Sequence, residues 1–562
     1  MRITRKQFLT EAGAAGGCTV LESLNRIFAR ADNSAELLLN NGAVVTMDDA
    51  RPYASAVAVR AGRVLAVGSD EELSAYRGAG TQVVDLGGRG VSPGLIDAHS
   101  HLNAFGHMER MFVILRPPEV TDFASLAAVL RQAARSKPEG EWIVGRGFQD
   151  FREGRFPRRQ ELDEAVPKHP LLIIHWGGQF GVANTLALQQ AGLLRRDAPD
   201  PYGGKYLRDR RSGLPDGVLI HYPAIYSVHA PEISEEEQRK CIRWSVEKFL
   251  REGVTCVHDN FVLPRQARQY VLLEQQGNLD LRVRVYPYVA NLEQARNLVA
   301  QMRRYVGPLV RMQGVKLAVD GYALMYDVPP ERQHLAQPMH PQAIFEEIIA
   351  AIHRADLQVD VHAVGDKGVD WTLQAFAHAA GRASAARERR HRIEHFPFRK
   401  LDSIRRAAEM NVPVCVQPAI VDFRVDDFRK RDFRAMQKYL ATINPLRTFL
   451  DEDVPLAFGA DVPAFPYFAP RDSLRCVLSR KTAAGWQLDP GEAIPFLEAL
   501  RVHTLGNAYA AFDEQDVGSL QPGKLADLVI WDRDLRAVKT AEHVRSLKVQ
   551  ATYLGGRCVF TA

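Results

Sequence analysis

The chain has 562 residues, which is too long for one ordinary domain, and its 46% hydrophobic and 25% charged residues are typical of a soluble globular protein. Lysine and arginine exceed aspartate and glutamate by 72 to 67 without a long block of one sign, so nucleic acid is not expected as a partner. The six cysteines have no Cys-x-x-Cys spacing, which argues against a disulfide framework and a thiolate zinc site.

The first residues have features of an export signal. Thr4-Arg5-Lys6-Gln7-Phe8-Leu9 resembles a twin-arginine motif with lysine in the second arginine position, and Ala29-Arg30-Ala31 offers an A-x-A cleavage site. Residues 1–31 are therefore predicted to be a signal segment of a periplasmic protein. Glu11 and Glu22 interrupt the weakly apolar region, so an amphipathic N-terminus on a cytoplasmic protein is the alternative. No later run approaches the ~20 apolar residues of a spanning helix, and no membrane span is predicted.

A histidine pair follows the next strongly apolar run. Gly90 to Ile96 has the pattern of a buried strand, and His99 and His101 lie directly after it. Residues two apart on an extended chain point to the same side, so both imidazoles can reach one point beyond the strand's carboxyl end. Neutral ring nitrogens are ligands for zinc, iron, nickel or cobalt. The spacing predicts a metal site, and two unrelated surface histidines are the alternative, because short motifs often match by chance.

From residue 91 to about 515, short apolar runs alternate with longer amphipathic segments. Eight apolar runs, counting the one before His99, predict an α/β fold, a (β/α)8 TIM barrel with its chemistry at the carboxyl ends of the strands. The later strands are expected at Val254 to His258, Leu281 to Val289, Gly314 to Asp320, Gln358 to His362, Arg392 to Phe396, Val412 to Gln417 and Pro455 to Asp461. The helical patterns are Glu235 to Glu252, Leu292 to Val306, Pro341 to Ala355 and Lys367 to Ala380.

Two regions do not fit the barrel count. Residues 105–234 separate the first two barrel strands by far more than an ordinary loop, so we expect an inserted subdomain with its own strand at Leu171 to Trp176. Residues 32–90 and 516–562 carry short valine and leucine runs between glycine turns, as in Ala56 to Val59 and Asp527 to Trp531. The two ends are predicted to form one small composite β-sandwich.

Three later strands of the predicted barrel end in residues that can bind metal. The fifth ends at His362, the sixth at His395 and the eighth at Asp461. His391 lies four residues before His395, as in a helical zinc site, but Pro397 favours a strand, so His395 is the expected ligand and His391 a structural or supporting group. An aspartate after a strand is more often a helix cap than a ligand. Together with the first pair, however, the set indicates one metal centre at the barrel rim.

These positions resemble the ordered ligand set of the amidohydrolase superfamily and, more narrowly, of its YtcJ-like branch, amidohydrolase 3. The resemblance covers nearly everything after the leader, including the insertion. It implies a barrel that carries metal beside a composite β-sandwich. The implied ligands are His99, His101, His362, His395 and Asp461. The stretches that carry the resemblance are Val91 to His99, His362 to Asp366, His391 to His395 and Gly518 to Asp527.

The resemblance also implies a lysine ligand on the fourth strand. In the binuclear members of the superfamily this lysine is carboxylated and bridges two metals, and Lys316 lies in the matching place. A buried lysine beside cations loses its proton more readily, which favours its reaction with carbon dioxide. The alternative is an ion pair between Lys316 and a neighbouring carboxylate. One or two divalent metal ions are expected, with zinc as the first choice.

The chemistry that follows is hydrolysis of an amide-type C–N bond. A divalent metal lowers the pKa of water and polarises a carbonyl group. As the resemblance implies, Asp461 binds metal, accepts the proton of the water and passes it to the leaving amine. A mononuclear deaminase of the same superfamily, in which Lys316 stays an amine, is the alternative. A non-catalytic binding protein ranks last, because all the expected ligand types are present.

Two departures from the family pattern lie where substrate contacts are expected. Asp320-Gly321 is followed by Tyr322 where a serine is usual, and His221 stands where an acidic residue is more usual. With Trp176 of the insertion, Tyr322 and His221 are the predicted substrate-binding residues. Aromatic residues near the first and fourth strands predict a largely apolar pocket for an N-substituted, N-acyl, cyclic or aromatic amide, with core packing as their alternative role. This small molecule is the expected partner, and a homodimer is the assembly to test.

Overall fold

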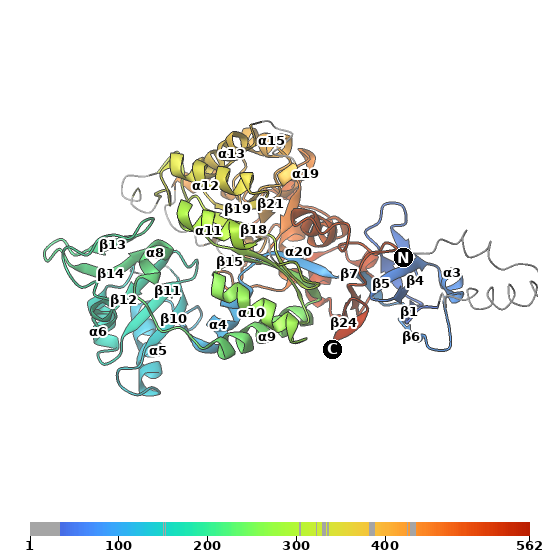
Figure 1. Cartoon of the computed structure of the whole chain (residues 1–562), viewed down its shortest axis with the longest axis horizontal. Helices are drawn as coiled ribbons and strands as arrows, with labels where there is room; N and C mark the ends of the chain where they lie inside the picture. Colours follow the sequence, from blue (N-terminus) through green and yellow to red (C-terminus); the bar gives the residue numbers. More distant parts are fainter. Residues whose placement is uncertain are drawn as a thin grey trace, which may run out of the picture.

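The computed structural model describes residues 34–562 except 150, 152, 303–304, 322, 329–332, 334–335, 382–387, 424 and 427–433. A central unit of strands and helices has the insertion on one side and a β-rich unit on the other (Figure 1). The predicted signal segment 1–31 and the predicted substrate residue Tyr322 lie outside the described residues. In the parts of the chain that are described, no helix combines the length and the apolar character that crossing a bilayer requires.

Two parallel sheets form the centre of the molecule. Their strand orders are β17-β16-β15-β8 and β18-β19-β20-β21-β22, and all pairings within them are parallel. The sheets adjoin at two places: Tyr288 bridges to Lys316, and the Asp461 amide donates to the His99 carbonyl oxygen at 2.7 Å. The strands are β8 (Leu95–Ser100), β15 (Val254–Val262), β16 (Arg282–Pro287), β17 (Val310–Met312), β18 (Gly314–Ala318), β19 (Gln358–Ala363), β20 (Arg392–His395), β21 (Val414–Val416) and β22 (Leu456–Phe458). The predicted α/β class with parallel strands is confirmed.

Helices alternate with the parallel strands, as the sequence predicts. In α9, Ser234 caps the N-terminus by accepting from the Glu237 amide, three glutamates occupy the first turn, and buried residues at helical spacing join the core. The main helices of this unit are α9 (Glu235–Arg251), α10 (Pro264–Gln275), α11 (Leu292–Met302), α12 (Gln342–Arg354), α13 (Asp366–Ala380), α15 (Leu401–Glu409), α19 (Leu446–Asp451) and α20 (Pro470–Ser479). Shorter helices elsewhere are α3 (Asp70–Ser74), α16 (Ile420–Phe423), α18 (Arg434–Leu440), α21 (Phe496–Arg501), α22 (Asn507–Ala510) and α23 (Ala541–Ser546).

Two further sheets come from the ends of the chain. N-terminal strands alone form the sheet β5-β4-β1-β6, and strands from both ends form the sheet β25-β24-β23-β7-β2-β3. Side chains from both ends, such as Leu39 and Leu528, pack in one apolar cluster. Arg282 in β16 makes a bidentate ion pair with Asp527, at N–O distances of 2.6 and 2.9 Å, which ties these sheets to the parallel unit. The strands are β1 (Leu37–Asn40), β2 (Ala43–Val45), β3 (Tyr53–Ala54), β4 (Ala56–Arg60), β5 (Arg63–Gly68), β6 (Gln82–Asp85), β7 (Gly90–Pro93), β23 (Leu528–Trp531), β24 (Val549–Leu554) and β25 (Arg557–Thr561).

The apolar run before the histidine pair forms two strands, not the single strand predicted. β7 pairs with β2 and β23, whereas β8 begins at Leu95 and pairs with β15. Gly94 separates the two strands. A Cβ at this position would lie 2.2 Å from Oγ1 of Thr255, so glycine is needed for the close approach of the backbone to β15. The change of sheet at Gly94 leaves His99 inside β8.

The long segment between β8 and β15 contains a six-stranded sheet of order β13-β14-β12-β11-β10-β9 with its own apolar cluster. Phe105, the first residue of the predicted insertion, lies in α4 (Leu102–Met111), and its ring is 5.2 Å from that of Trp244 in α9. The inserted sheet therefore follows α4. Its elements are β9 (Val113–Ile114), α5 (Phe123–Arg135), β10 (Ile143–Phe148), α6 (Arg159–Ala165), β11 (Leu171–His175), β12 (Phe180–Ala183), α7 (Thr185–Gln190), β13 (Lys205–Arg208), β14 (Pro215–Ile220) and α8 (His221–Tyr226).

Candidate metal centre

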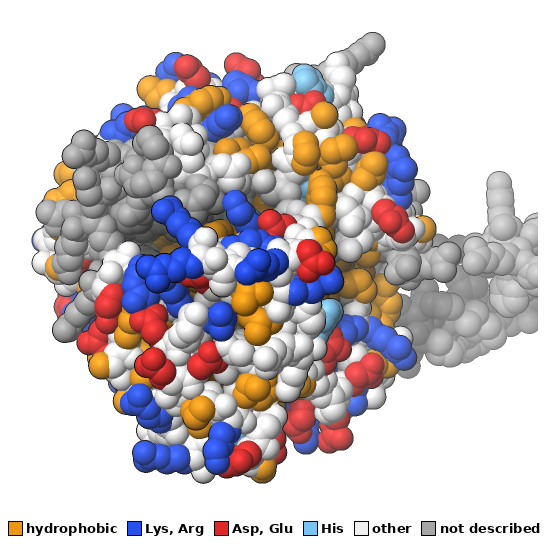
Figure 2. Space-filling model, turned by 90° about the vertical axis from the view of Figure 1, so that its left-hand side faces the viewer, with side chains coloured by type: hydrophobic (Ala, Val, Ile, Leu, Met, Phe, Trp, Pro, Cys, Tyr) orange, Lys and Arg blue, Asp and Glu red, His pale blue; other side chains and the backbone are white. Residues whose placement is uncertain are grey.

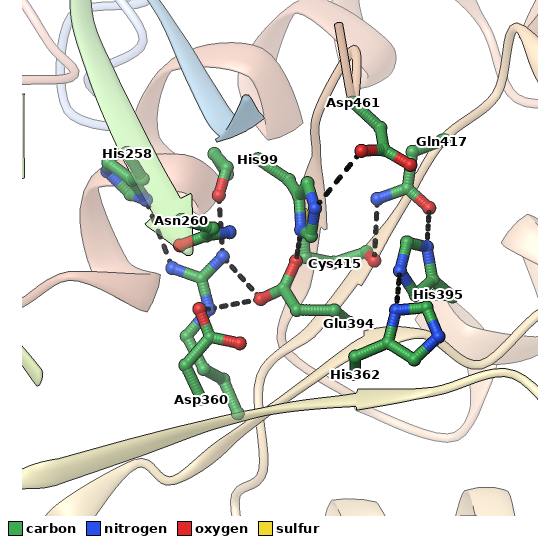
Figure 3. A network of polar contacts seen from close by, with 12 residues as sticks. His99, His258, Asn260, Asp360, His362, Glu394, His395, Cys415, Gln417 and Asp461 are labelled. Carbon is green, nitrogen blue, oxygen red and sulfur yellow. Dashed lines mark hydrogen bonds and ion pairs between the residues drawn. The ribbon is translucent and has the colours of Figure 1, made fainter. Parts of the chain in front are cut away.

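The parallel strands bring the predicted histidine and aspartate ligands to one rim. They are His99 in β8, His101 directly after it, His362 in β19, His395 in β20 and Asp461 beyond β22. A ligand atom from each of His99, His395 and Asp461 lies within 4.8 Å of the others. Nε2 of His101 is 3.0 Å from Oδ1 of Asp461, and Nε2 of His395 is 2.8 Å from Nδ1 of His362 (Figure 3 shows the latter pair). Side chains far apart in the sequence thus form one cluster of nitrogen and oxygen donors.

The backbone at this rim adopts uncommon conformations. Asp461 and His395 have positive φ angles of 54° and 79°, and His221 and Phe261 have 66° and 63°. L-residues rarely enter this region, and they stay there only where the surrounding structure holds them. Such strain concentrates at functional sites, which agrees with the placement of two predicted ligands.

Hydrogen bonds behind the imidazoles leave ring nitrogens available to a metal. Nδ1 of His101 donates to the carbonyl oxygen of Asn260 at 2.7 Å, and Nδ1 of His395 donates to Oε1 of Gln417 at 2.6 Å. A neutral His395 ring with this donor keeps an unprotonated Nε2. Nε2 of His362 is buried and has no hydrogen-bond partner among the described residues. A divalent metal satisfies such nitrogens, so the residues present fit a site with histidine and carboxylate ligands.

The neighbouring charges and burial set the protonation states of these groups. Burial, with a contribution from His99, lowers the pKa of His395 to about 4, which keeps this imidazole neutral. Burial raises the pKa of Asp461, but the neighbouring imidazoles of His99 and His101 outweigh it and hold this pKa well below its usual value. For His99, burial lowers the pKa and the carboxylate of Glu394 outweighs it, so the pKa rises to about 9. His99 thus lies in a strongly negative environment, which also favours a metal cation.

Lys316 lies beside the cluster and forms an ion pair. Its side chain is buried, and Nζ is 3.0 Å from Oδ1 of Asp360 in β19. The alternative weighed from the sequence, an ion pair with a neighbouring carboxylate, is therefore the arrangement in this structure. Burial and the nearby carboxylate of Glu394 raise the pKa of Asp360 to about 6. Carboxylation of Lys316 stays a prediction.

A buried charged layer supports the ligands and is absent from the sequence predictions. Arg392, which is fully buried, donates from Nε to Glu394 at 2.6 Å and from Nη2 to the Ala98 carbonyl oxygen at 2.6 Å. Nη1 lies 3.1 Å from Nδ1 of His258, and Glu394 contacts Nδ1 of His99 (Figure 3). Arg392 and Glu394 are charged residues at alternate positions of a strand expected to be buried. This pattern was the sequence signal for a buried charged layer, because buried charges need partners.

A pocket with a volume of about 90 Å³ opens beside the cluster and is walled mainly by apolar side chains. Trp176, predicted as a substrate contact, lines it together with Phe398, Ile420 and Phe465. Asp461 also lines it, so the ligand cluster faces the pocket. Phe148 and Phe180, two other aromatic residues of the insertion, are buried and do not line this pocket.

His221, the second predicted substrate contact, lies behind the pocket wall. Gly321 lines the pocket, and a Cβ at Gly321 would come 1.8 Å from the His221 ring. The ring is 4% exposed, neither ring nitrogen has a hydrogen-bond partner within the described chain, and burial lowers the pKa of His221 to about 4. His221 therefore shapes the pocket through the Gly321 backbone.

Comparison with known proteins places the chain among hydrolases. Residues 82–560 match the model of the amidohydrolase family. The chain is 31% identical to the protein LONG AFTER FAR-RED 3 of Arabidopsis thaliana, over 94% of this chain and 92% of that protein. It is 27% identical to an N-substituted formamide deformylase of Arthrobacter pascens, with 93% and 97% covered, and 24% identical to YtcJ of Bacillus subtilis, with 93% and 98% covered.

A solved structure agrees with these relatives. An uncharacterized metal-dependent hydrolase from Pyrococcus horikoshii superimposes with a TM-score of 0.68 and 25% sequence identity, over 90% of this chain and 98% of that chain. The resemblance drawn from the sequence motifs is confirmed. The chain is a metal-dependent hydrolase that belongs to the amidohydrolase family.

Proposed function

We propose that this hydrolase cleaves an amide-type C–N bond in an N-substituted, N-acyl or cyclic amide. The observation that carries the proposal is the convergence of histidines and Asp461 on one rim beside an apolar pocket. Similarity to a protein named N-substituted formamide deformylase supports formamides as the first class to test. The apolar wall formed by Trp176, Phe398 and Phe465 favours a hydrophobic substituent on the nitrogen.

The proposed catalytic domain is one closed (β/α)8 TIM barrel of residues 91–515. It includes an inserted subdomain at residues 105–234. The adjoining edges of the two parallel sheets support closure. Residues 32–90 and 516–562 are proposed to form a composite β-sandwich, which their shared apolar cluster supports. Loops at the carboxyl ends of the strands and the insertion would then determine specificity.

The metal-holding residues in this proposal are His99, His101, His362, His395 and Asp461, with zinc as the expected ion. A bound divalent metal would lower the pKa of a water molecule and polarise the substrate carbonyl group. Zinc is proposed because imidazole and carboxylate are its usual ligands in catalytic sites. Gln417 and the Asn260 carbonyl oxygen hold the outer nitrogens of two of these rings and so fix which nitrogen faces the rim.

Asp461 moves the proton. Its Oδ1 faces Nε2 of His99 at 3.4 Å and Nε2 of His101 at 3.0 Å, which leaves Oδ2 for the pocket. The neighbouring imidazoles outweigh the effect of burial and keep the pKa of Asp461 well below its usual value, so the carboxylate is ionised and ready to accept. Oδ2 takes the proton of the attacking water and delivers it to the leaving nitrogen.

The test is elemental analysis of the purified protein together with a hydrolysis screen. N-formyl, N-acyl and cyclic amides are assayed with the protein stripped by a chelator and then reloaded with each divalent metal. We expect one of these classes to be hydrolysed, with activity lost on chelation and restored by metal. Activity that persists in metal-free protein, or a metal-loaded protein that hydrolyses none of the three classes, would overturn the proposal.

A mononuclear deaminase is the second candidate, and the Lys316–Asp360 ion pair favours it because an ammonium group cannot be a metal ligand. Metal content measured with and without bicarbonate separates the two. Two metals per chain only with bicarbonate indicate a carboxylated Lys316. One metal in both conditions, with ammonia released from amino-substituted rings, indicates the deaminase.

The cellular location of the protein and its oligomeric state are proposed separately from the reaction. We propose export with removal of residues 1–31, which N-terminal sequencing of the protein from the periplasmic fraction tests. We propose a homodimer, which light scattering tests. An intact N-terminus in the cytoplasmic fraction, or a monomer mass, would contradict the respective proposal.

A further inference from the structure

Arg146 in β10 is a half-buried arginine that forms no ion pair with any described residue. Its Nε is buried and has no hydrogen-bond partner in the described part of the chain. Burial lowers the pKa of Arg146 more than the surrounding groups raise it. Removing a charge from water without pairing it costs free energy, so proteins normally pair such groups.

Arg146 does not line the pocket itself but lies beside a glycine whose neighbour in the chain does. A Cβ on Gly178 would be 3.3 Å from Nη2 of Arg146 and 3.4 Å from the Tyr222 ring, so both side chains flank this glycine. The preceding residue, Gly177, lines the pocket together with Asp461. Burial lowers the pKa of Arg146, and the Asp461 carboxylate partly opposes that effect.

Other arginines of the insertion donate hydrogen bonds to groups of the protein, as an arginine with a structural role does. Nη1 of Arg116 donates to Glu109 at 2.8 Å. Arg159 donates to Oγ1 of Thr185 at 2.9 Å and to the Pro215 carbonyl oxygen at 3.1 Å. Arg146 makes no such contact with any described residue. Its guanidinium group is therefore available to a partner that the described chain does not supply.

We propose that Arg146, assisted by the hydroxyl group of Tyr222, binds a carboxylate on the substrate. The inference rests on the proposed amide hydrolysis and narrows it: the substrate is an amide that carries a hydrophobic group and a carboxylate. The planar guanidinium fork matches a carboxylate in geometry and charge. Lys and Arg side chains also gather around a hollow on the face that Figure 2 shows, and their field attracts an anion.

The experiment compares two substrates that differ only in this charge, N-formylphenylalanine and N-formylphenylalaninamide. We expect the metal-loaded protein to have a kcat/KM about 10–100-fold higher for the acid. Arg146→Gln should lower kcat/KM for the acid by the same factor and leave the amide within about twofold, whereas Arg146→Lys should retain part of the preference. Arg135→Gln, an exposed arginine at the end of α5, is the matched control and should change neither value.

Equal losses for both substrates in Arg146→Gln, or equal kcat/KM values in the unmodified protein, would overturn the inference. Circular dichroism and thermal melting of each variant check that it is folded.

Calorimetric titration without turnover separates this inference from the proposed function. We expect 3-phenylpropionate to bind about tenfold more tightly than 3-phenylpropionamide, and this difference to vanish in Arg146→Gln. That result without hydrolysis of either formyl compound upholds the inference and rejects the proposed function. Hydrolysis that does not depend on Arg146 upholds the proposed function and rejects the inference about Arg146. If 2-phenylethylphosphonate binds more tightly than 3-phenylpropionate and this binding depends on Arg146, the ligand group is of the phosphate type. That result would overturn the inference of a carboxylate.

Discussion

The carboxylate of Glu394 contacts Nδ1 of His99 across a sequence separation of 295 residues (Figure 3). The other oxygen of Glu394 accepts from Nε of Arg392 at 2.6 Å, so the carboxylate is held between a cation and the imidazole. This contact directs the other ring nitrogen of His99 toward Asp461, at 3.4 Å. Glu394 is therefore a positioning residue for one of the proposed metal ligands.

We expect Glu394→Gln to weaken metal binding by about 10–100-fold, because an amide neither orients the imidazole as firmly nor raises its basicity. Competition with a chromophoric chelator measures the affinity. Glu293→Gln, on the exposed side of α11, is the matched control. An affinity equal to that of the unmodified protein would show that Glu394 does not support His99.

Asp461→Asn should retain metal and lose at least about 100-fold in kcat, because the amide keeps an oxygen for the metal but cannot accept the proton. Elemental analysis and steady-state kinetics on the same preparation test both parts. Asp197→Asn, an exposed residue of the insertion, should have unchanged kcat. A fully active Asn variant would remove Asp461 from the proton-transfer role.

The packing of His221 on Gly321 predicts a specific steric effect. In Gly321→Ala the new methyl group would lie 1.8 Å from the His221 ring, so the pocket wall must move. We expect kcat/KM to fall at least tenfold and the free energy of unfolding to fall by about 1–3 kcal/mol. The double variant with His221→Ala should recover part of both losses.

Gly80→Ala is the control for this pair, because no described residue other than its two chain neighbours has a heavy atom within 4 Å of the added carbon. A double variant no better than Gly321→Ala alone would show that the contact with His221 is not the cause.

His391 predicts a pH dependence of stability. Burial, with a contribution from His353, lowers its pKa to about 3, and its Nδ1 accepts from the Val359 amide at 3.0 Å, so the folded state keeps this ring neutral. Below about pH 6.5 the unfolded chain binds a proton that the folded protein does not. Stability therefore falls as the pH drops from about 6.5 toward 3, by up to about 1.4 kcal/mol per pH unit from this residue.

His391→Gln should reduce the pH dependence of the free energy of unfolding by the equivalent of about one bound proton. Denaturant unfolding between pH 7 and pH 4 measures this change. Because other buried histidines also titrate, the free energy of unfolding still depends on pH in the variant and in the unmodified protein. The exposed His378, changed to Gln in the same way, should leave the slope as it is. An identical slope in the His391 variant would contradict the assignment.

The main elements and the types of ligand could be predicted because their signals are local. Each predicted parallel strand overlaps an observed one, and the four predicted helices are present. The division at Gly94 could not be predicted, because its cause is the approach of Thr255 from another strand. The alternate charges at positions 392 and 394 indicate that Glu394 needs a buried partner, but they do not identify His99 as that partner.

The sequence by itself determined where extended and helical segments lie and which strand ends carry imidazoles and carboxylates, since both follow from the spacing of neighbouring residues. Only the tertiary structure decided which side chains meet. Glu394 reaches His99, Lys316 pairs with Asp360, and Arg146 is left without a partner in the described chain. These outcomes depend on the register between strands that lie from 44 to 295 residues apart, and no local pattern of residues encodes that register.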